Sequence, residues 1–420
     1  MENLQNPEAY LLSDAGVAKT NNFATIYPAL NELLHDSEEQ PSRNGGTREV
    51  LQFKTMIGSP QSRCVGVRNR NMNIFFLLAE AIWIWVGRSD VAFLDMFNSK
   101  MKNYSDDGVV FHAPYGFRLR FWGESTLYSE SMPKHHLEAS TDQISEALTM
   151  LQRNSDTRRV VMSIWNPDLD LNVVTKDVPC NDTVFLKVRN GELNMTIANR
   201  SNDLHWGLPT NVFQFSFLLE IMSELLGLKV GTQVHNSDSL HIYDSNPITK
   251  TMLASSTPNL YDFVEASSMD LFPKGEGQEI DSKLHSIDYL FHTIITGLSQ
   301  IKSLEEAHEY LQWCRGGDIK NTYLNNIAFL LGVYRLYKMS PKQNSVRISI
   351  IQLILDWWDL ENGQGQGVSL DYMLMAINFF AKRMKSAYDL KVKKTVLLGL
   401  KSAGVDTMKA VKLTQILGNF

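Results

Sequence analysis

A chain of 420 residues with 44% hydrophobic and 20% charged residues has the composition of an ordinary globular protein, which excludes a disordered or fibrous chain. Its formal net charge of −6 argues against a protein that coats nucleic acid. Cys64, Cys180 and Cys314 lie far apart, which excludes a disulfide framework and a zinc motif. The longest apolar run, residues 74–87, is too short to cross a bilayer, and no secretion signal precedes it. We therefore expect a soluble protein of the reducing cytoplasm.

The first part of the chain predicts helices and strands in mixed order. Residues 41–53 predict a glycine-rich turn that leads into a strand, and residues 73–86 predict a helix buried on most sides and closed by Gly87. Residues 141–154 have a Thr or Asp N-cap and apolar residues at helical spacing, and residues 158–165 are strand-like.

A β-hairpin and then a long helix are predicted next. Residues 183–199 hold two apolar runs on either side of the turn "RNGE", the clearest hairpin signal in the chain. Residues 209–228 predict a helix with proline at its start and Gly227 near its end. From about residue 285 onward the sequence predicts successive helices, with a flexible break at 361–367.

Cys180 stands between a proline and a polar cluster, whereas a core cysteine normally has apolar neighbours. A structural cysteine is still the simpler interpretation, because most single cysteines carry no chemistry. The arginines that stand at the ends of predicted elements are Arg43, Arg158, Arg159 and Arg200. Each alone is best explained as a solvated surface residue, but together they can bind a phosphate through bidentate hydrogen bonds. Such a cluster would also lower the pKa of a nearby thiol and make it a nucleophile.

Three further features allow both a structural and a functional interpretation. Ser201 and Asp203 precede a Gly-Leu-Pro turn and a helix, where capping alone would explain them. Glu80 lies inside an apolar helix, where it is either a satisfied hydrogen-bond partner or an acid with an elevated pKa that handles protons. His241 and Tyr243 alternate on one strand face, from which both can contact a sugar hydroxyl.

In this order the motifs resemble those of the thymidylate synthase and pyrimidine-nucleotide hydroxymethylase superfamily over roughly residues 20–250. The motifs that carry the resemblance are "SRNGG", "EAIWIWVG", "YGFRLRFW", "LQRNSDTRRVVMSIWNP", "VPCN", "NRSNDLHWGLPTN" and "HIYD". The resemblance implies an α+β fold with a mixed β-sheet layered with helices. It also implies a catalytic domain over residues 1–284, to which this chain adds a mostly helical C-terminal extension over residues 285–420.

The resemblance implies a catalytic role for four residues. Cys180 matches the nucleophile that adds to C6 of the pyrimidine, and Glu80 matches the acid that organises proton transfer. Tyr115 matches the tyrosine implicated in removing the C5 proton, and Asp203 matches the aspartate that anchors the pterin. The residues expected to contact the folate cofactor, 5,10-methylenetetrahydrofolate, are Asp203, Trp83 and Arg70. Arg70 stands where a lysine often meets the glutamyl tail, and no metal is expected.

The residues that match the family's nucleotide contacts are Arg43, Arg158, Arg159, Arg200, Ser201, Asn211, His241 and Tyr243. In the family the adjacent arginine pair reaches into the other subunit's site, so Arg158 and Arg159 imply a homodimer. Asn211 matches the residue that reads the base edge. Its amide offers one acceptor and one donor, which fits N3–H and O4 of uracil, whereas family members that act on cytosine tend to have an aspartate there. Asn211 therefore implies dUMP as the substrate.

Several positions depart from the family pattern. Asn181 replaces the histidine that usually follows the nucleophile, Val178 replaces a proline, and Asn199 stands where glutamine is usual. The paired tryptophans expected near residues 101–108 are absent, and so is the short apolar tail that seals the folate site.

The absent tryptophans and the absent tail favour entry of water into the site, whereas a synthase needs a dry site. We therefore expect a deoxyuridylate (dUMP) hydroxymethyltransferase of the kind used by phages that replace thymine with hydroxymethyluracil, acting in the host cytoplasm. A divergent thymidylate synthase is the second hypothesis. The third is a non-catalytic module that binds nucleotides or partners, against which the retention of Cys180 argues, since binding alone does not need a nucleophile.

Overall fold

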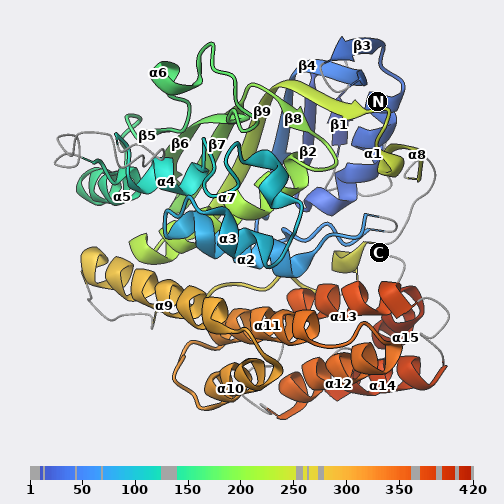
Figure 1. Cartoon of the computed structure of the whole chain (residues 1–420). Coiled ribbons are helices and arrows are strands. Elements are labelled where there is room, and N and C mark those ends of the chain that lie inside the picture. Colours follow the sequence, from blue (N-terminus) through green and yellow to red (C-terminus); the bar gives the residue numbers. More distant parts are fainter. Residues whose placement is uncertain are drawn as a thin grey trace.

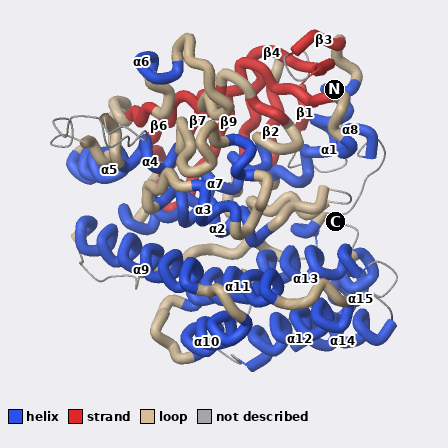
Figure 2. The backbone as a smooth tube through the Cα atoms, in the orientation of Figure 1, coloured by secondary structure: helices blue, strands red, loops and turns tan. Residues whose placement is uncertain are grey.

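The computed structural model describes residues 10–12, 15–42, 45–67, 70–123, 140–251, 259–262, 264–272, 279–360, 369–384, 390–402 and 406–417. Within these ranges, a mixed β-sheet lies above two successive layers of helices (Figures 1 and 2). This arrangement confirms the α+β fold predicted from the sequence.

Nine strands of the described part of the chain form one sheet with the order β1-β2-β4-β9-β7-β6-β5, to which β3 adds beside β4 and β8 beside β9. They are β1 (Tyr10–Leu12), β2 (Val17–Thr20), β3 (Glu39–Ser42), β4 (Gly45–Ile57), β5 (Val161–Ser163), β6 (Asn181–Arg189), β7 (Glu192–Asn199), β8 (Asn202–Asp203) and β9 (Lys229–Tyr243). The pairs β2–β4, β7–β9 and β8–β9 are parallel, and the others are antiparallel.

The helices of the first 262 residues are α1 (Phe23–His35), α2 (Ile74–Trp85), α3 (Val91–Asp95), the 3₁₀ turn η2 (Met101–Tyr104), α4 (Tyr115–Arg120), α5 (Gln143–Arg153), α6 (Pro167–Asp170), α7 (Leu208–Leu226), α8 (Pro247–Thr251) and the 3₁₀ turn η4 (Leu260–Asp262). Those that follow are α9 (Ile280–Gln300), α10 (Leu304–Arg315), α11 (Thr322–Met339), α12 (Asn344–Leu360), α13 (Leu370–Met384), α14 (Leu390–Ser402) and α15 (Thr407–Ile416). Helix α7 packs on β7 and β9, and α2 packs on α7 and on α11 and α13 (Figure 1).

The two faces of the sheet differ in burial. One transverse row runs across five strands through Met162, Val184, Ile197, His235 and Thr55. Four of these side chains have no exposed surface, and Met162 is 1% exposed. This face lies against the helices. In the neighbouring row on the opposite face, Val161 and Phe185 are exposed, and Thr196, Val234 and Met56 are partly exposed.

The most strongly patterned predicted elements are confirmed. The helix predicted over 73–86 is α2, and the one predicted over 209–228 is α7, which ends at Gly227 with a left-handed φ of 67°. The hairpin is β6 and β7, joined by Asn190 and Gly191, both at positive φ. The strand predicted over 158–165 is only three residues long, and the break predicted at 361–367 lies outside the described residues.

The helical extension shares a buried boundary with the rest of the molecule. Arg63, with no exposed surface, forms an ion pair with Glu220 of α7, and Glu220 also accepts a hydrogen bond of 2.7 Å from the Met269 N–H. Asp371 of α13 accepts hydrogen bonds from Ser267 and Tyr261. The division placed between residues 284 and 285 falls inside α9, and the existence of two separate domains stays a prediction.

The boundary between the helical extension and the rest of the molecule also contains a cluster of aromatic rings. Phe75, in the first turn of α2, stacks on Tyr334 of α11 at 4.8 Å between ring centroids, and Phe379 of α13 meets Phe75 edge-on at 5.3 Å. All three side chains are buried. The helix that carries Glu80 is therefore covered at its start by the C-terminal helices.

Candidate active site

Cys180 lies at the end of the loop that precedes β6 and is partly exposed. Its N–H donates a hydrogen bond of 3.4 Å to the hydroxyl of Tyr115, the first residue of α4. On its other side, Nη2 of Arg200 lies 3.7 Å from Sγ, and the Arg200 N–H donates to the Cys180 carbonyl at 3.1 Å. The loop, α4 and the end of β7 thus bring together three residues that the sequence singled out.

The pKa of the Cys180 thiol is raised with Arg200 alone beside it, and activation of the thiol by an arginine cluster stays a prediction. Burial is the main cause, the Arg200 charge opposes it, and Asp177, Asp182 and Asp203 add to it. Of the three expected arginines that the structure describes, Arg200 is the one beside the thiol. Arg200 also donates to the carbonyls of Pro179 at 2.7 Å and Val178 at 3.1 Å, so it holds the backbone of the loop.

Two of the other three arginines lie away from this cluster. Arg158 and Arg159 are exposed just before β5, and Arg43 lies outside the described residues. Ser201, which follows Arg200, is partly exposed. The phosphate-binding roles of these four residues stay predictions.

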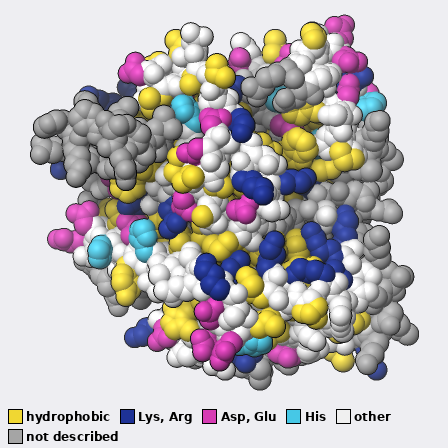
Figure 3. Space-filling model, viewed as in Figure 1, with side chains coloured by type: hydrophobic (Ala, Val, Ile, Leu, Met, Phe, Trp, Pro, Cys, Tyr) yellow, Lys and Arg dark blue, Asp and Glu magenta, His cyan; other side chains and the backbone are white. Residues whose placement is uncertain are grey.

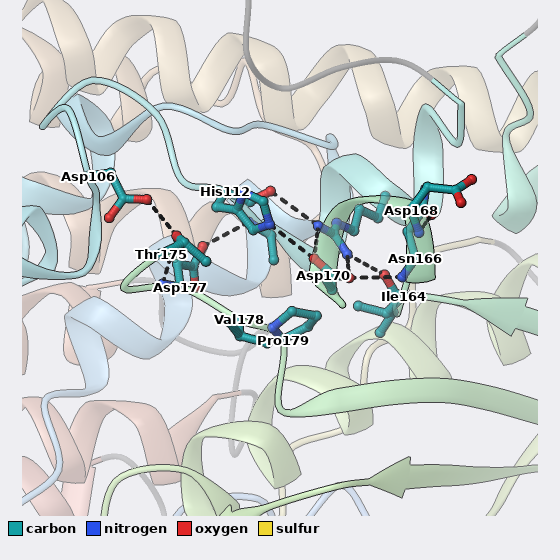
Figure 4. A network of polar contacts seen from close by, with 12 residues as sticks. Asp106, His112, Ile164, Asn166, Asp168, Asp170, Thr175, Asp177, Val178 and Pro179 are labelled. Carbon is teal, nitrogen blue, oxygen red and sulfur yellow. Dashed lines mark hydrogen bonds and ion pairs between the residues drawn. The ribbon is translucent and has the colours of Figure 1, made fainter. Parts of the chain in front are cut away.

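A buried polar cluster holds the start of the Cys180 loop (Figure 4). Arg118 of α4 donates to both carboxylate oxygens of Asp170, one of them at 2.8 Å, and to the Ile164 carbonyl at 2.7 Å. Nε2 of His112 lies 3.0 Å from the same carboxylate, and the Asn166 N–H donates to it at 2.8 Å. The Asp170 carboxylate is therefore fully used as an acceptor, and we name Asp170, Arg118 and His112 the clasp.

A second set of hydrogen bonds holds the end of the loop. The hydroxyl of Thr175 and the N–H of Lys176 both donate to Asp106, and the carboxylate of Asp177 accepts the Ala113 N–H at 2.9 Å (Figure 4). The loop that presents Cys180 is thus fixed at both ends. Sequence reasoning missed these residues, and the charge pattern "YGFRLRF" was the one available signal, since it places an arginine in an apolar helix.

Glu80 is partly buried on α2, where its Oε2 accepts a hydrogen bond of 2.7 Å from Nε2 of Gln214 on α7. Nε2 of Gln214 also donates to the Leu77 carbonyl at 3.2 Å, which fixes the direction of the amide. Burial raises the pKa of Glu80 to about 7, although the Gln214 hydrogen bond lowers it. A carboxyl group with this pKa can exchange protons near neutral pH, and the proton-handling role of Glu80 stays a prediction beside its structural hydrogen bond to Gln214.

Asn211 lies in the first turn of α7. Its Oδ1 accepts from Nδ2 of Asn181 at 3.2 Å, and its Nδ2 donates to Oδ1 of Asn202 at 3.5 Å. Asn181 directly follows Cys180, so Asn211, which is expected to read the base, and the Cys180 thiol have this residue as a common neighbour.

Asp203 caps a short turn: its Oδ1 accepts the N–H groups of His205 at 2.7 Å and Trp206 at 3.3 Å. Arg70, which is 8% exposed, donates to the His205 carbonyl and so braces the same turn. Burial raises the pKa of Asp203 above its ordinary value. Trp83 is buried and donates its indole N–H to the Asp90 carbonyl at 3.1 Å. The folate contacts of Asp203, Arg70 and Trp83 stay predictions.

An aromatic surface surrounds the Asp203 turn. The rings of His241 and Tyr243 meet edge-on at 5.0 Å, and Trp206, which is 55% exposed, lies 6.5 Å from Tyr243. Tyr104 of η2 is 47% exposed, and its pKa is raised by burial and then by the charges of Asp203 and Tyr243. Tyr104 lies in the segment that lacks the family's tryptophans, and the sequence analysis did not select it.

A pocket of about 500 Å³ opens beside Arg200. Its wall includes Asp182, Asn199 and the strand residues Lys54 and Asp238. Burial raises the pKa of Asp182 to about 6 despite the opposing charge of Arg200. In the described ranges no group of three acidic, histidine or cysteine side chains is arranged to hold a metal, and no helix has the length and apolar character to span a membrane.

Comparison with known proteins identifies the family. Residues 27–260 match the family model of thymidylate synthase. The chain is 40% identical over 216 residues to the deoxyuridylate hydroxymethyltransferase of Bacillus phage SP01, which covers 51% of this chain and 55% of the relative. It is 36% identical over 235 residues to the protein of that name from Pseudomonas phage M6 (54% and 62%), and 29% identical over 245 residues to the one from Delftia phage PhiW-14 (56% and 62%). The chain thus spans between 55% and 62% of the length of these curated relatives. Because the family model covers more than half of the chain, the chain belongs to the thymidylate synthase family.

Proposed function

We propose that this protein is a dUMP hydroxymethyltransferase that uses 5,10-methylenetetrahydrofolate as its one-carbon donor. The observation that carries the proposal is a pair of adjacent hydrogen bonds: the Cys180 N–H donates to the Tyr115 hydroxyl, and the next residue, Asn181, donates to Asn211. They link the proposed nucleophile, proton-transfer group and base reader. The phage relatives that bear this activity in their names support the hydroxymethyl product over the methyl product.

The residues of the cluster suit the first half of the reaction. Asn211 binds the pyrimidine edge, which presents C6 to the Cys180 sulfur. Because Arg200 is the cation beside Sγ and burial raises the pKa of the thiol, the thiolate forms as the substrate enters rather than beforehand. Burial also raises the pKa of Tyr115 far above its usual range, so the tyrosine is a neutral phenol when it assists removal of the C5 proton.

The aromatic surface around Asp203 fits a flat pterin ring, with Trp206 and Tyr104 exposed enough to stack on it. When bound there, the folate supplies the one-carbon unit. In the second half of the reaction, Glu80 is the group suited to take a proton from the water that adds to the exocyclic methylene carbon at C5. Its pKa of about 7 gives a substantial ionised fraction at neutral pH.

We further propose a homodimer formed through the open face of the sheet. A row on this face runs through the paired residues Val161, Phe185, Thr196, Val234 and Met56, of which Val161 is 50% and Phe185 36% exposed. A second copy packed on this face would bury an apolar strip and bring the exposed Arg158 and Arg159 toward the other subunit's Arg200.

The product of turnover tests the proposal. With dUMP and methylenetetrahydrofolate in heavy-oxygen water, mass analysis should find 5-hydroxymethyl-dUMP that carries the solvent oxygen, together with tetrahydrofolate. The Cys180→Ala variant should give no product while it still binds dUMP. Thymidylate with stoichiometric dihydrofolate would instead establish a synthase, and absence of turnover with dUMP binding intact would establish a binding module.

A further inference from the structure

One buried side chain, Gln214, joins Glu80 to the part of α7 that carries Asn211. Gln214 lies one turn after Asn211 on this helix and is 5% exposed. The next residue, Phe215, stacks on the ring of Tyr115 with 6.5 Å between the ring centroids. The turn of α7 that follows Asn211 therefore contacts both Glu80 and Tyr115, two of the residues expected to act in catalysis.

A backbone carbonyl fixes the direction of the Gln214 amide. The Leu77 carbonyl can only accept a hydrogen bond, so the amide atom that lies 3.2 Å from it must be the donor, Nε2. The two hydrogens of Nε2 then go to the Leu77 carbonyl and to Oε2 of Glu80, which lies at 2.7 Å. A half-turn of the amide would place Oε1 against the Leu77 carbonyl, and two acceptors repel each other.

This fixed direction acts differently on the two protonation states of Glu80. A hydrogen bond from a neutral donor is stronger to a charged carboxylate than to a neutral acid, so Nε2 stabilises the charged form. The neutral acid would need an acceptor for its own proton, but the amide presents only its donor to Glu80. Oε1 of Gln214 is buried and has no hydrogen-bond partner among the described residues.

The charges on neighbouring elements do not supply the same effect. Helices α3, α4, α7, α9, α11 and α13 pack on α2. Their titratable and charged groups include Asp95, Tyr115, Glu220, Asp288, Arg335 and Asp371. None of these, and none of the Lys and Arg side chains that gather on the surface near the C-terminal helices in Figure 3, shifts the pKa of Glu80. Burial raises that pKa, and the Gln214 hydrogen bond is the one contact in the described ranges that lowers it.

We propose that Gln214 is a positioning residue that makes Glu80 a usable base at neutral pH, through an amide donor whose direction the Leu77 carbonyl fixes. The consequence for turnover rests on the proposed function, in which Glu80 takes a proton from the attacking water. With a pKa of about 7, Glu80 is ionised in about half of the molecules at pH 7. An equally buried carboxyl group without the donor would be mainly neutral there and could not accept that proton.

The variant Gln214→Met tests the proposal, because it keeps the length of the side chain and removes the donor. Infrared difference spectra recorded from pH 5 to pH 9 follow the band of the neutral carboxyl group, which is identified by its loss in Glu80→Gln. We expect the midpoint for Glu80 near pH 7 in the wild type and about one pH unit higher in Gln214→Met. The ionised fraction at pH 7 then falls from about half to about a tenth, and the rise of kcat/KM for dUMP with pH should move upward in parallel.

A second glutamine separates this effect from a loss of packing. Gln233 has no exposed surface, and its Nε2 donates to the Val212 carbonyl of α7 at 3.3 Å. Gln233→Met should therefore lower the melting temperature without moving the midpoint for Glu80. If Gln214→Met does not fold, Gln214→Leu replaces it with the same expected shift.

The outcomes distinguish the two proposals, because the infrared titration needs neither dUMP nor turnover. A wild-type protein that neither binds nor converts dUMP overturns the proposed function, and the titration of Glu80 still tests Gln214. A folded Gln214 variant that has the same midpoint as the wild type overturns the role of Gln214 and leaves the proposed function standing. An equal shift in Gln233→Met overturns it as well, since the effect would then come from packing.

Discussion

At the scale of single residues, the raised pKa of Glu80 lets its carboxyl group exchange a proton near neutral pH, and it makes the folded protein less stable when that proton is lost. Its pKa of about 7 in the folded protein lies above the ordinary value of 4.5 that applies in the unfolded chain. The stabilisation that Glu80 contributes is therefore fully present below pH 4.5 and is lost as the pH rises through 7. The difference is on the order of 3 kcal/mol.

Replacement of Glu80 by glutamine should separate stability from activity. Since glutamine has no proton to lose, Glu80→Gln should unfold at higher urea concentration than the wild type at about pH 8 and show a smaller gain at about pH 5. Turnover of dUMP should fall by about a hundredfold or more, the usual loss when an acid–base group is removed. The matched control is Glu146→Gln, an exposed change on α5 that should alter neither. Equal stability of Glu80→Gln and wild type at both pH values would contradict the elevated pKa.

The sequence predicted which residue types form the site better than it predicted their electrostatics. A cysteine after a proline, an acid in an apolar helix and an asparagine at a helix start can each be found from local pattern. The pKa of the Cys180 thiol cannot, because it depends on burial and on carboxylates from three separate segments, among them Asp177 and Asp203. The same holds for Tyr104, which reaches Asp203 only through the tertiary fold.

At the scale of elements, the clasp ties the four-residue helix α6 to α4. Burial raises the pKa of Asp170, but the hydrogen bond and charge of Arg118 hold it below its ordinary value, so the carboxylate stays charged. An element as short as α6 has little stability of its own. The position of the start of the Cys180 loop therefore depends on one buried charged pair.

Neutralisation of Asp170 should destabilise the protein by about 3–5 kcal/mol, because it leaves the Arg118 charge buried without a partner. Asp168→Asn, on the exposed side of the same helix, is the matched control and should cost little (Figure 4). Urea unfolding at neutral pH measures both. Equal effects of Asp170→Asn and Asp168→Asn would show that the clasp does not stabilise the fold.

Elements with a strong local signal were predicted well, and those defined by long-range pairing were not. The hairpin of β6 and β7 follows from "RNGE" between two apolar runs, and α7 follows from its proline, its apolar length and Gly227. Strand β9 extends over fifteen residues because it pairs with β4 on one side and β7 on the other, which no local pattern reveals. Strand β5 is shorter than predicted, since it lies at the sheet edge and pairs only with β6 among the described strands.

At the scale of the whole molecule, the proposed dimer makes a prediction about mixed subunits. Arg158 and Arg159 are exposed and do not join the cluster around Cys180 of their own chain. If they serve the partner's site, a mixture of Cys180→Ala and Arg159→Ala chains should recover up to about a quarter of the wild-type activity, because heterodimers form half of the dimers and have one intact site of two.

Activity of the mixture should require subunit exchange, so it should appear only after the two variants are unfolded and refolded together or co-expressed. A mixture of Cys180→Ala with Cys180→Ser chains is the control and should stay inactive. Mixed dimers that form, as shown by differently tagged chains, but remain inactive would mean that the arginines act within their own subunit.

The aromatic contact of Phe75 with Tyr334 and Phe379 has a consequence for synthesis on the ribosome. About 300 residues separate Phe75 from Phe379. At 5–20 residues per second, α2 is therefore synthesised on the order of half a minute before the helices that cover it. During that interval the nascent chain presents uncovered aromatic rings to chaperones and to other nascent chains. A chain stopped after residue 284 should therefore bind a hydrophobic dye strongly and aggregate, whereas a soluble, dye-free fragment would show that the first part folds without the last. If the first part of the chain needs the C-terminal helices in order to fold, the speed of translation through these helices determines the yield of folded protein.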